Sequence, residues 1–151
     1  MEEEWIKFDI DKLTQLQDDY QSTLSIIKAS LPEINLNSRK QIVNFFEKSF
    51  KIELQSSRIK EISSYLLKFG ENSEEYEIIT GIILYFKMYY QLKNYITYIL
   101  NHHEEGMIQL RWYMGKWCLQ NRQTLPYSKA IIDCITEISN PDLIVKETTW
   151  E

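Results

Sequence analysis

Residues 34–42, with the sequence INLNSRKQI, lie between two amphipathic segments and decide how the chain folds around them. Pro32 stops the preceding segment, and either Asn37 or Ser38 can be the N-cap of the helix that follows. If the residues before the cap are extended, the carboxamides of Asn35 and Asn37 project from the same face of the backbone. We therefore expect a polar corner between two helices.

Cations at the start of the second helix are unusual. Arg39 and Lys40 fall in its first turn, where the helix dipole disfavours positive charge. Carboxamides, a hydroxyl, unpaired backbone donors and an arginine would together form a binding site for a polyanion. An ordinary capped helix start accounts for the same residues, so the pattern alone leaves both interpretations open.

The composition describes one globular domain with long helices. The chain has 151 residues, of which 44% are hydrophobic and 26% charged, so it is long enough to bury a core. Only four glycines and three prolines interrupt it, which favours helices over a many-turned β-sandwich. The formal net charge of -5 means that nucleic-acid binding would need a local basic strip.

Several features favour a cytoplasmic protein that does not enter a membrane. The first residues, MEEE, lack the basic and apolar regions of a signal peptide. The most apolar segment, residues 78–100, is interrupted by Lys87 and Lys93, which argues against a membrane span. Cys118 and Cys134 do not form a CxxC motif, so we expect buried, reduced thiols.

The apolar periodicity predicts a mainly α fold, a helical bundle with long antiparallel helices. After a strand-like start at residues 6–10, either Asp9 or Asp11 caps a long helix that extends to Leu31. Shorter helices are expected after Ser38 and after residues 56–58, the latter ending at Gly70. The longest helix should follow and continue to about residue 101. It is apolar on more than one face, which indicates the centre of a bundle.

Short β-strand segments are expected near the C-terminus. Residues 107–119 carry aromatic and β-prone side chains around one glycine, and residues 143–147 form a second strand-like run. Between them, Ser128 opens a short helix that buries side chains up to Ile135. We divide the chain into a helical region over residues 1–106 and a mixed strand and helix extension over residues 107–151. An apolar strand so close to the last residue suggests that a larger architecture continues beyond it.

The residues HHEE at 102–105 raise the possibility of a metal site. Zinc-binding pairs on a helix need spacings of three or four residues, and adjacent histidines do not share a face. We therefore expect a solvated helix end and no metal ligands there. Trp112 and Trp117 are expected either in the core or facing a partner subunit.

Several of these motifs occur in the same order in a known family. Residues 34–42 closely resemble the Asn-Leu-Asn-Ser-x-x-Gln-Leu corner in the thumb subdomain of family A DNA polymerases, the family of bacterial DNA polymerase I and its phage relatives. Residues 1–13 resemble the segment that begins the polymerase region of that family, with Trp5 in place of a glycine. Residues 56–57 are similar to the Ser-Thr of a thumb-tip helix, and residues 86–95 to a later thumb helix, with Gln91 in place of a lysine.

The second half of the chain resembles the same family more weakly. Gly115 and Lys116 fall where the family has Thr-Gly-Arg, and lysine loses the planar fork that arginine uses for bidentate hydrogen bonds. The segment from Asn121 through Gln123 to Pro126 is similar to the family's Asn-x-Gln-Asn-x-Pro. Residues 143–147 stand where the family's motif A strand carries its first metal-binding aspartate.

The resemblance implies a thumb that grips primer–template DNA through its backbone and minor groove. Such contacts position the duplex without reading its sequence. By position, the implied DNA-binding residues are Asn35, Asn37, Ser38, Arg39, Ser56, Ser57, Lys87, Lys116, Asn121 and Gln123. Helix capping by the serines and simple solvation of the lysines are the alternatives.

The resemblance does not imply that this chain is an enzyme by itself. The motif A position holds Glu147, and the family's motif B lysine and second metal-binding aspartate lie outside this sequence. Two-metal phosphoryl transfer needs both carboxylates, so we expect no catalytic residue, bound metal or cofactor.

We therefore expect the thumb of a split or degenerate phage-type polymerase that acts in DNA replication. A partner chain would supply palm and fingers, and residues 143–147 would add a strand to its sheet. The alternative is a small helical adaptor or inhibitor that binds another protein and does not bind DNA.

Overall fold

The computed structural model describes residues 4–125 and 128–143, and these form parts of two compact units. The described residues of the first unit lie within 4–22 and 89–143, and those of the second unit are residues 23–88. The boundary that the sequence suggests after residue 106 therefore falls within the first unit. Two long helices, α1 (Ile10–Ser30) and α4 (Glu74–Gln91), contribute residues to both units.

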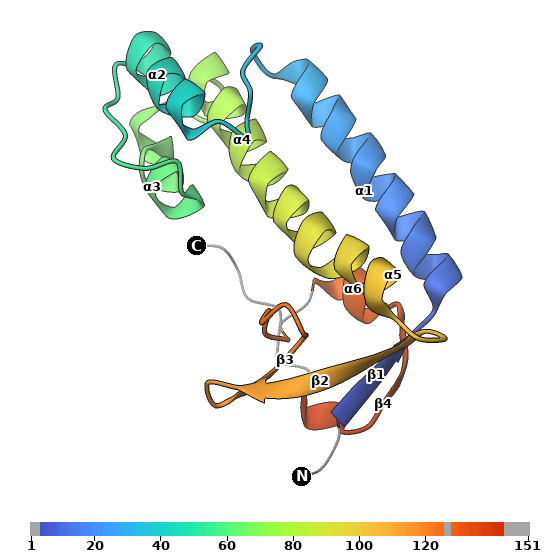
Figure 1. Cartoon of the computed structure of the whole chain (residues 1–151). Coiled ribbons are helices and arrows are strands. Elements are labelled where there is room, and N and C mark those ends of the chain that lie inside the picture. The colour runs from blue at the N-terminus through green and yellow to red at the C-terminus, as the bar shows by residue number, and fades with distance from the viewer. Residues whose placement is uncertain (1–3, 126–127, 144–151) are drawn as a thin grey trace. The chain divides into compact units, whose positions relative to one another are not determined.

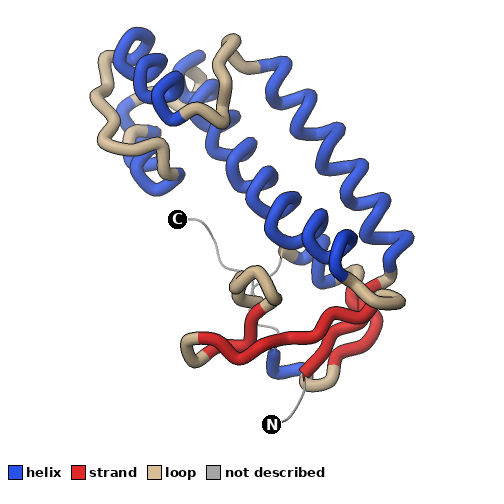
Figure 2. Tube along the Cα trace, in the orientation of Figure 1, coloured by secondary structure: helices blue, strands red, loops and turns tan. Residues whose placement is uncertain are grey.

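The first unit contains a four-stranded antiparallel sheet (Figures 1 and 2). Its order is β3-β2-β1-β4. The strands are β1 (Glu4–Phe8), β2 (Met107–Tyr113), β3 (Lys116–Cys118) and β4 (Ile135–Ile138). Alternate side chains of β1 and β2 enter the core, among them Ile6, Phe8, Ile108 and Leu110. The strand expected at residues 6–10 is present at Glu4–Phe8 instead, because Asp9 caps α1 and Ile10 begins it. It pairs with strands that come from the last third of the chain.

The helices of the first unit begin at local caps. An Asp9 side-chain oxygen accepts from the backbone amide of Lys12 at 3.1 Å, which confirms the predicted aspartate cap of α1. Ser128 likewise caps α6 (Lys129–Ile132) through the backbone amide of Ile131, as predicted. The helix from α4 continues through a π-helical segment, η2 (Leu92–Thr97), into α5 (Tyr98–His102). The predicted end of this long helix near residue 101 is confirmed.

Two expectations for the C-terminal part need correction. Ile135 does not extend α6, because it pairs with Phe8 as the first residue of β4. The carbonyl of Cys134 also accepts from the amide of Asp9 at 2.7 Å, so tertiary pairing ends the helix early. Leu143 lies in a 3-10 turn, η3 (Pro141–Leu143), and the rest of the predicted strand 143–147 lies outside the described residues.

The second unit is helical in its described part. It contains α2 (Arg39–Phe50), α3 (Ile59–Ser64) and the 3-10 turn η1 (Leu66–Lys68), with the C-terminal part of α1 and most of α4. Phe45, Phe46, Phe50 and Phe69 form a connected cluster, with ring centroids 5.2–6.2 Å apart. The helix predicted up to Gly70 is shorter than expected, because it ends at Ser64 and tightens into η1.

Helices and an antiparallel sheet therefore share the fold. The sequence predicted strands mainly near the C-terminus. In the structure, the N-terminal strand β1 lies between β2 and β4 in the sheet. Within the described residues, no helix combines the length and the apolar character that crossing a membrane requires.

Candidate nucleic-acid interface

Hydrogen bonds fix the corner formed by residues 35–41 in the second unit. The Ser38 hydroxyl accepts from the backbone amide of Gln41 at 3.3 Å, so Ser38 is the N-cap of α2. The Asn35 side chain accepts from the amide of Asn37 at 3.0 Å, and the Gln41 side chain accepts from the amide of Asn35 at 2.9 Å. Leu36 is buried while Asn35 and Asn37 are exposed. The predicted common face of the carboxamides assumed an extended segment, whereas residues 36–37 form a turn in which the Ser38 amide donates to the Asn35 carbonyl oxygen at 3.0 Å.

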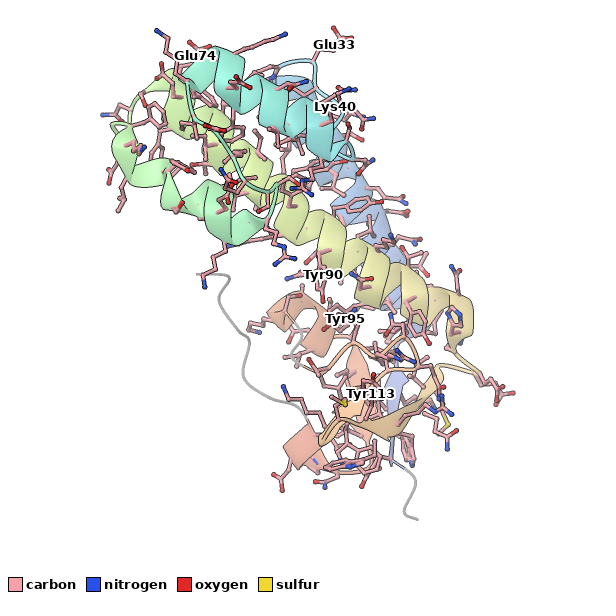
Figure 3. The ribbon with its side chains drawn as sticks, turned by 60° about the vertical axis from the view of Figure 1, so that its left-hand side comes forward. Glu33, Lys40, Glu74, Tyr90, Tyr95 and Tyr113 are labelled. Atoms are coloured by element: carbon pink, nitrogen blue, oxygen red, sulfur yellow. The ribbon has the colours of Figure 1, made fainter. Side chains whose placement is uncertain are left out.

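Arg39 ties this corner to the loop that precedes α3. Its Nη2 donates to the carbonyl oxygen of Gln55 at 2.7 Å. This contact brings two predicted segments together, the corner and the serine pair at 56–57. A guanidinium carries five N–H donors, so one internal contact leaves Arg39 able to bind an anion. Glu33 and Lys40 mark the two sides of the corner in Figure 3, and Arg39 and Lys40 are both exposed.

The serine pair does not cap α3. Arg58 occupies the N-cap position without a side-chain hydrogen bond, and Ser56 only accepts from the Arg58 amide at 3.4 Å. A carboxylate oxygen of Glu61 accepts from the amides of Gln55 and Ser56 at 2.7 and 3.0 Å. An internal carboxylate thus uses two backbone donors that a phosphate would otherwise contact.

Lys87 lies on α4 in the same unit and is half-buried. Within the part of the chain that the structure describes, no hydrogen bond or ion pair joins Lys87 to the corner. Lys116 belongs to the first unit, where it is exposed on the edge strand β3. Among the described residues, neither lysine side chain forms a hydrogen bond or an ion pair with another residue.

Asn121 and Gln123 hold a loop against the π-helical segment. Asn121 donates through Nδ2 to the carbonyl oxygen of Asn94 at 3.0 Å, and its Oδ1 accepts from the amide of Gln123 at 3.2 Å. The Tyr90 hydroxyl donates to Gln123 Oε1, and the Tyr95 hydroxyl donates to the carbonyl oxygen of Thr124 (Figure 3). A structural role therefore accounts for both carboxamides.

The sequence did not single out Tyr90 and Tyr95 as a pair. Their spacing of five residues matches a π-helical repeat, and their rings touch with centroids 6.2 Å apart. Burial raises the pKa of both hydroxyls, and for Tyr95 the neighbouring Tyr90 and Cys118 add to the rise. Both groups therefore stay protonated at neutral pH and act as donors to the loop.

The histidines and cysteines take structural positions. His102 stacks on Tyr98 at 4.1 Å, and the Nδ1 of His103 accepts from the amide of Gly106 at 3.0 Å. Cys118 and Cys134 are buried and free, as predicted. The described part of the chain contains no group of three or more side chains suited to hold a metal ion.

The comparisons with known proteins give no relative. No protein-family model, no curated protein and no solved structure matches this chain.

Proposed function

We propose that this chain is a thumb-type module that binds the backbone of primer–template DNA, as its resemblance to family A polymerases implies. The observation that supports this most is the rigid, exposed corner at Asn35, Asn37 and Arg39, immediately before a capped helix. Carboxamide and guanidinium donors on a fixed backbone suit phosphate and sugar contacts, which need no sequence readout.

The proposal includes a thumb-like bundle in which α1 and α4 run antiparallel. Within the first unit, Gln17 contacts Thr97 at 3.1 Å and Tyr20 contacts Gln91 at 2.7 Å. Within the second unit, Leu31 lies 2.9 Å from the position that a Cβ on Gly81 would occupy. As residue numbers rise along α1, the numbers of the residues contacted on the later helix fall, from Thr97 through Gln91 to Gly81. This order is expected of an antiparallel pair. Distances between spin labels placed on α1 and α4 would test this arrangement.

The residues divide into contact and positioning roles in this proposal. In the second unit, Asn35, Asn37, Ser38 and Arg39 contact the DNA backbone and Lys87 adds positive charge. In the first unit, Lys116 is a separate positive charge for the DNA. Asn121 and Gln123 act indirectly by holding the loop at residues 119–124 against the helix. Ser56 and Ser57 lie beside the corner through the Arg39–Gln55 contact, where Glu61 limits how closely a phosphate approaches.

A binding titration of single variants tests the proposal. We expect Arg39→Gln to weaken binding to a labelled primer–template duplex uniformly across sequences and to reduce the salt slope by about 1. Arg39→Lys should retain part of the affinity, because charge remains while the planar fork is lost. Lys129→Gln removes one exposed charge elsewhere and is the matched control. Equal affinity in all four proteins would contradict the proposal.

We also propose that a second chain supplies palm and fingers, as the polymerase resemblance implies. The test mixes this chain with a palm-and-fingers protein that copurifies with it and measures primer extension. Restored extension supports the split arrangement, and failure of the mixture to extend a primer removes it.

The alternative is a protein-binding adaptor, which two exposed apolar side chains of the second unit favour. Leu67 is 94% exposed and Ile26 is 70% exposed. An adaptor would not bind duplex DNA in a salt-dependent way, so the same titration separates the two functions.

A further inference from the structure

The hairpin of β2 and β3 presents aromatic side chains to solvent. Met114 and Gly115 form its two-residue turn, with φ of 52° and 78°. Trp112 is 59% exposed and Tyr113 is 41% exposed. Trp112 also pairs across the strands with Trp117, with ring centroids 5.3 Å apart in an edge-to-face arrangement. Burying such rings inside a partner would stabilise them, so their exposure marks a binding surface.

The charge around this hairpin is opposite to that of the chain. The sequence from residue 106 to residue 132 contains no Asp or Glu, although the formal net charge of the protein is -5. The same stretch contains Arg111, Lys116 and Arg122, all exposed. The Arg122 guanidinium lies 5.0 Å from the centroid of the Tyr113 ring, a cation–π contact that places a positive charge beside an exposed aromatic.

We propose that this hairpin, residues 111–117 with Arg122, stacks the unpaired bases of single-stranded nucleic acid on its exposed rings. Trp112 and Trp117 lie on one face of the hairpin, and Tyr113, Lys116 and Arg122 lie on the other, so the basic side chains border the tryptophan face. Every base has a π-face that can stack on tryptophan or tyrosine, and the arginines and lysine neutralise the phosphates between bases. A duplex hides its base faces in the stack, so this surface selects unpaired strands. The proposal shares Lys116 with the duplex-binding function, but it depends on the rings of Trp112, Tyr113 and Trp117, which that function does not use.

Positive charge and exposed tryptophan together favour nucleic acid over a protein partner. Protein interfaces are themselves enriched in tryptophan, tyrosine, methionine and arginine, so the rings alone would also suit a protein partner. Arg111, Lys116 and Arg122 are exposed in a stretch without Asp or Glu, and this charge favours a polyanion. An anionic lipid surface also attracts basic and aromatic residues, and it is therefore an outcome that the experiment must distinguish.

The experiment measures anisotropy of a labelled oligothymidylate of about 16 nucleotides, a length that one binding site can cover. We expect Trp112→Ala to weaken binding about tenfold, because one stacked base is lost. Trp112→Phe keeps a ring and should retain much of the affinity. Met114→Ala is the matched control, since Met114 is 82% exposed in the same hairpin but has no π-face.

Circular dichroism checks that each variant folds. If Trp112→Ala unfolds, Trp112→Leu replaces it, because leucine keeps apolar bulk without a ring. Lys116→Gln should reduce the salt slope of single-strand binding by about 1, because one phosphate contact is lost.

Three outcomes would overturn the proposal: equal affinity of wild type and the ring-deleting variants, no binding of the oligothymidylate, or binding only to phosphatidylserine vesicles. The corner variant Arg39→Gln should leave single-strand affinity unchanged, and Trp112→Ala should leave duplex affinity unchanged. Failure of this proposal is thereby distinguished from failure of the duplex-binding function.

Discussion

A single hydroxyl sets the start of α2. Ser38 caps the helix through the Gln41 amide, so Ser38→Ala should lower the free energy of unfolding by about 1 kcal/mol. Ser38→Asp retains a capping oxygen and should recover most of the loss. Urea denaturation measures both changes. Unchanged stability in Ser38→Ala would show that the cap contributes nothing.

Asn121 makes its contribution through two hydrogen bonds inside the first unit. Asn121→Ala removes both hydrogen bonds and leaves the Asn94 carbonyl without this donor. The free energy of unfolding should therefore fall by about 1–2 kcal/mol. The neighbouring Gln120 is exposed, and Gln120→Ala should stay within about 0.5 kcal/mol of wild type. Thermal or urea unfolding distinguishes them, and equal losses would contradict a specific role for Asn121.

Residues with local partners could be predicted from the sequence, and residues with distant partners could not. The caps at Asp9 and Ser38 involve neighbours within a few positions, and short motifs narrowed each cap to two candidate residues. The contacts of Asn121 with Asn94 cross 27 positions, and those of Arg39 with Gln55 cross 16. No local pattern encodes these pairings.

At the level of the elements, two glycines with positive φ have different surroundings. Gly106 and Gly115 have φ of 86° and 78°, so alanine at either strains the backbone. A Cβ on Gly106 would also lie 2.8 Å from the Phe8 carbonyl oxygen where β1 meets β2, whereas nothing lies within 4 Å at Gly115.

We therefore expect Gly106→Ala to lose about 3 kcal/mol of stability, and Gly115→Ala about 1 kcal/mol. Gly70 has neither a positive φ nor a close neighbour, so Gly70→Ala should be nearly neutral. Urea denaturation measures the free energy of unfolding of the three variants and ranks their losses of stability. If Gly115→Ala were as destabilising as Gly106→Ala, close packing at the β1–β2 junction would not be the cause.

Elements with strong internal periodicity were predicted, and so were the strand segments near the N-terminus and within residues 107–119, but β4 and the π-helical segment were not. The long helix α1 and the capped helix α2 follow their apolar stripes. By contrast, β4 arises because Ile135 and Ile138 find β1, and the π-helical segment at 92–97 arises where a distant loop docks.

On the scale of the whole molecule, alkaline pH should destabilise the fold. Burial raises the pKa of the Cys118 and Cys134 thiols and of the Tyr90, Tyr95 and Tyr98 hydroxyls. The unfolded chain therefore loses these protons at lower pH than the folded protein. Stability from these groups is full below the ordinary thiol pKa of 9.0 and falls as pH rises above it.

Urea denaturation from about pH 7 to about pH 10.5 measures this effect. The free energy of unfolding should be constant at the lower end of the range and decrease steadily above about pH 9. Stability that stays constant or rises over the alkaline part would contradict the burial of these groups.

The most direct test of the duplex-binding function is the salt dependence of wild-type affinity for primer–template DNA. Each phosphate that the protein neutralises releases counterions, so the logarithm of the binding constant should fall linearly with the logarithm of salt concentration. The cations of the second unit, Arg39, Lys40 and Lys87, predict a slope of about -2 to -4. Absence of binding at low salt, or an affinity that salt does not change, would contradict DNA-backbone recognition by this chain.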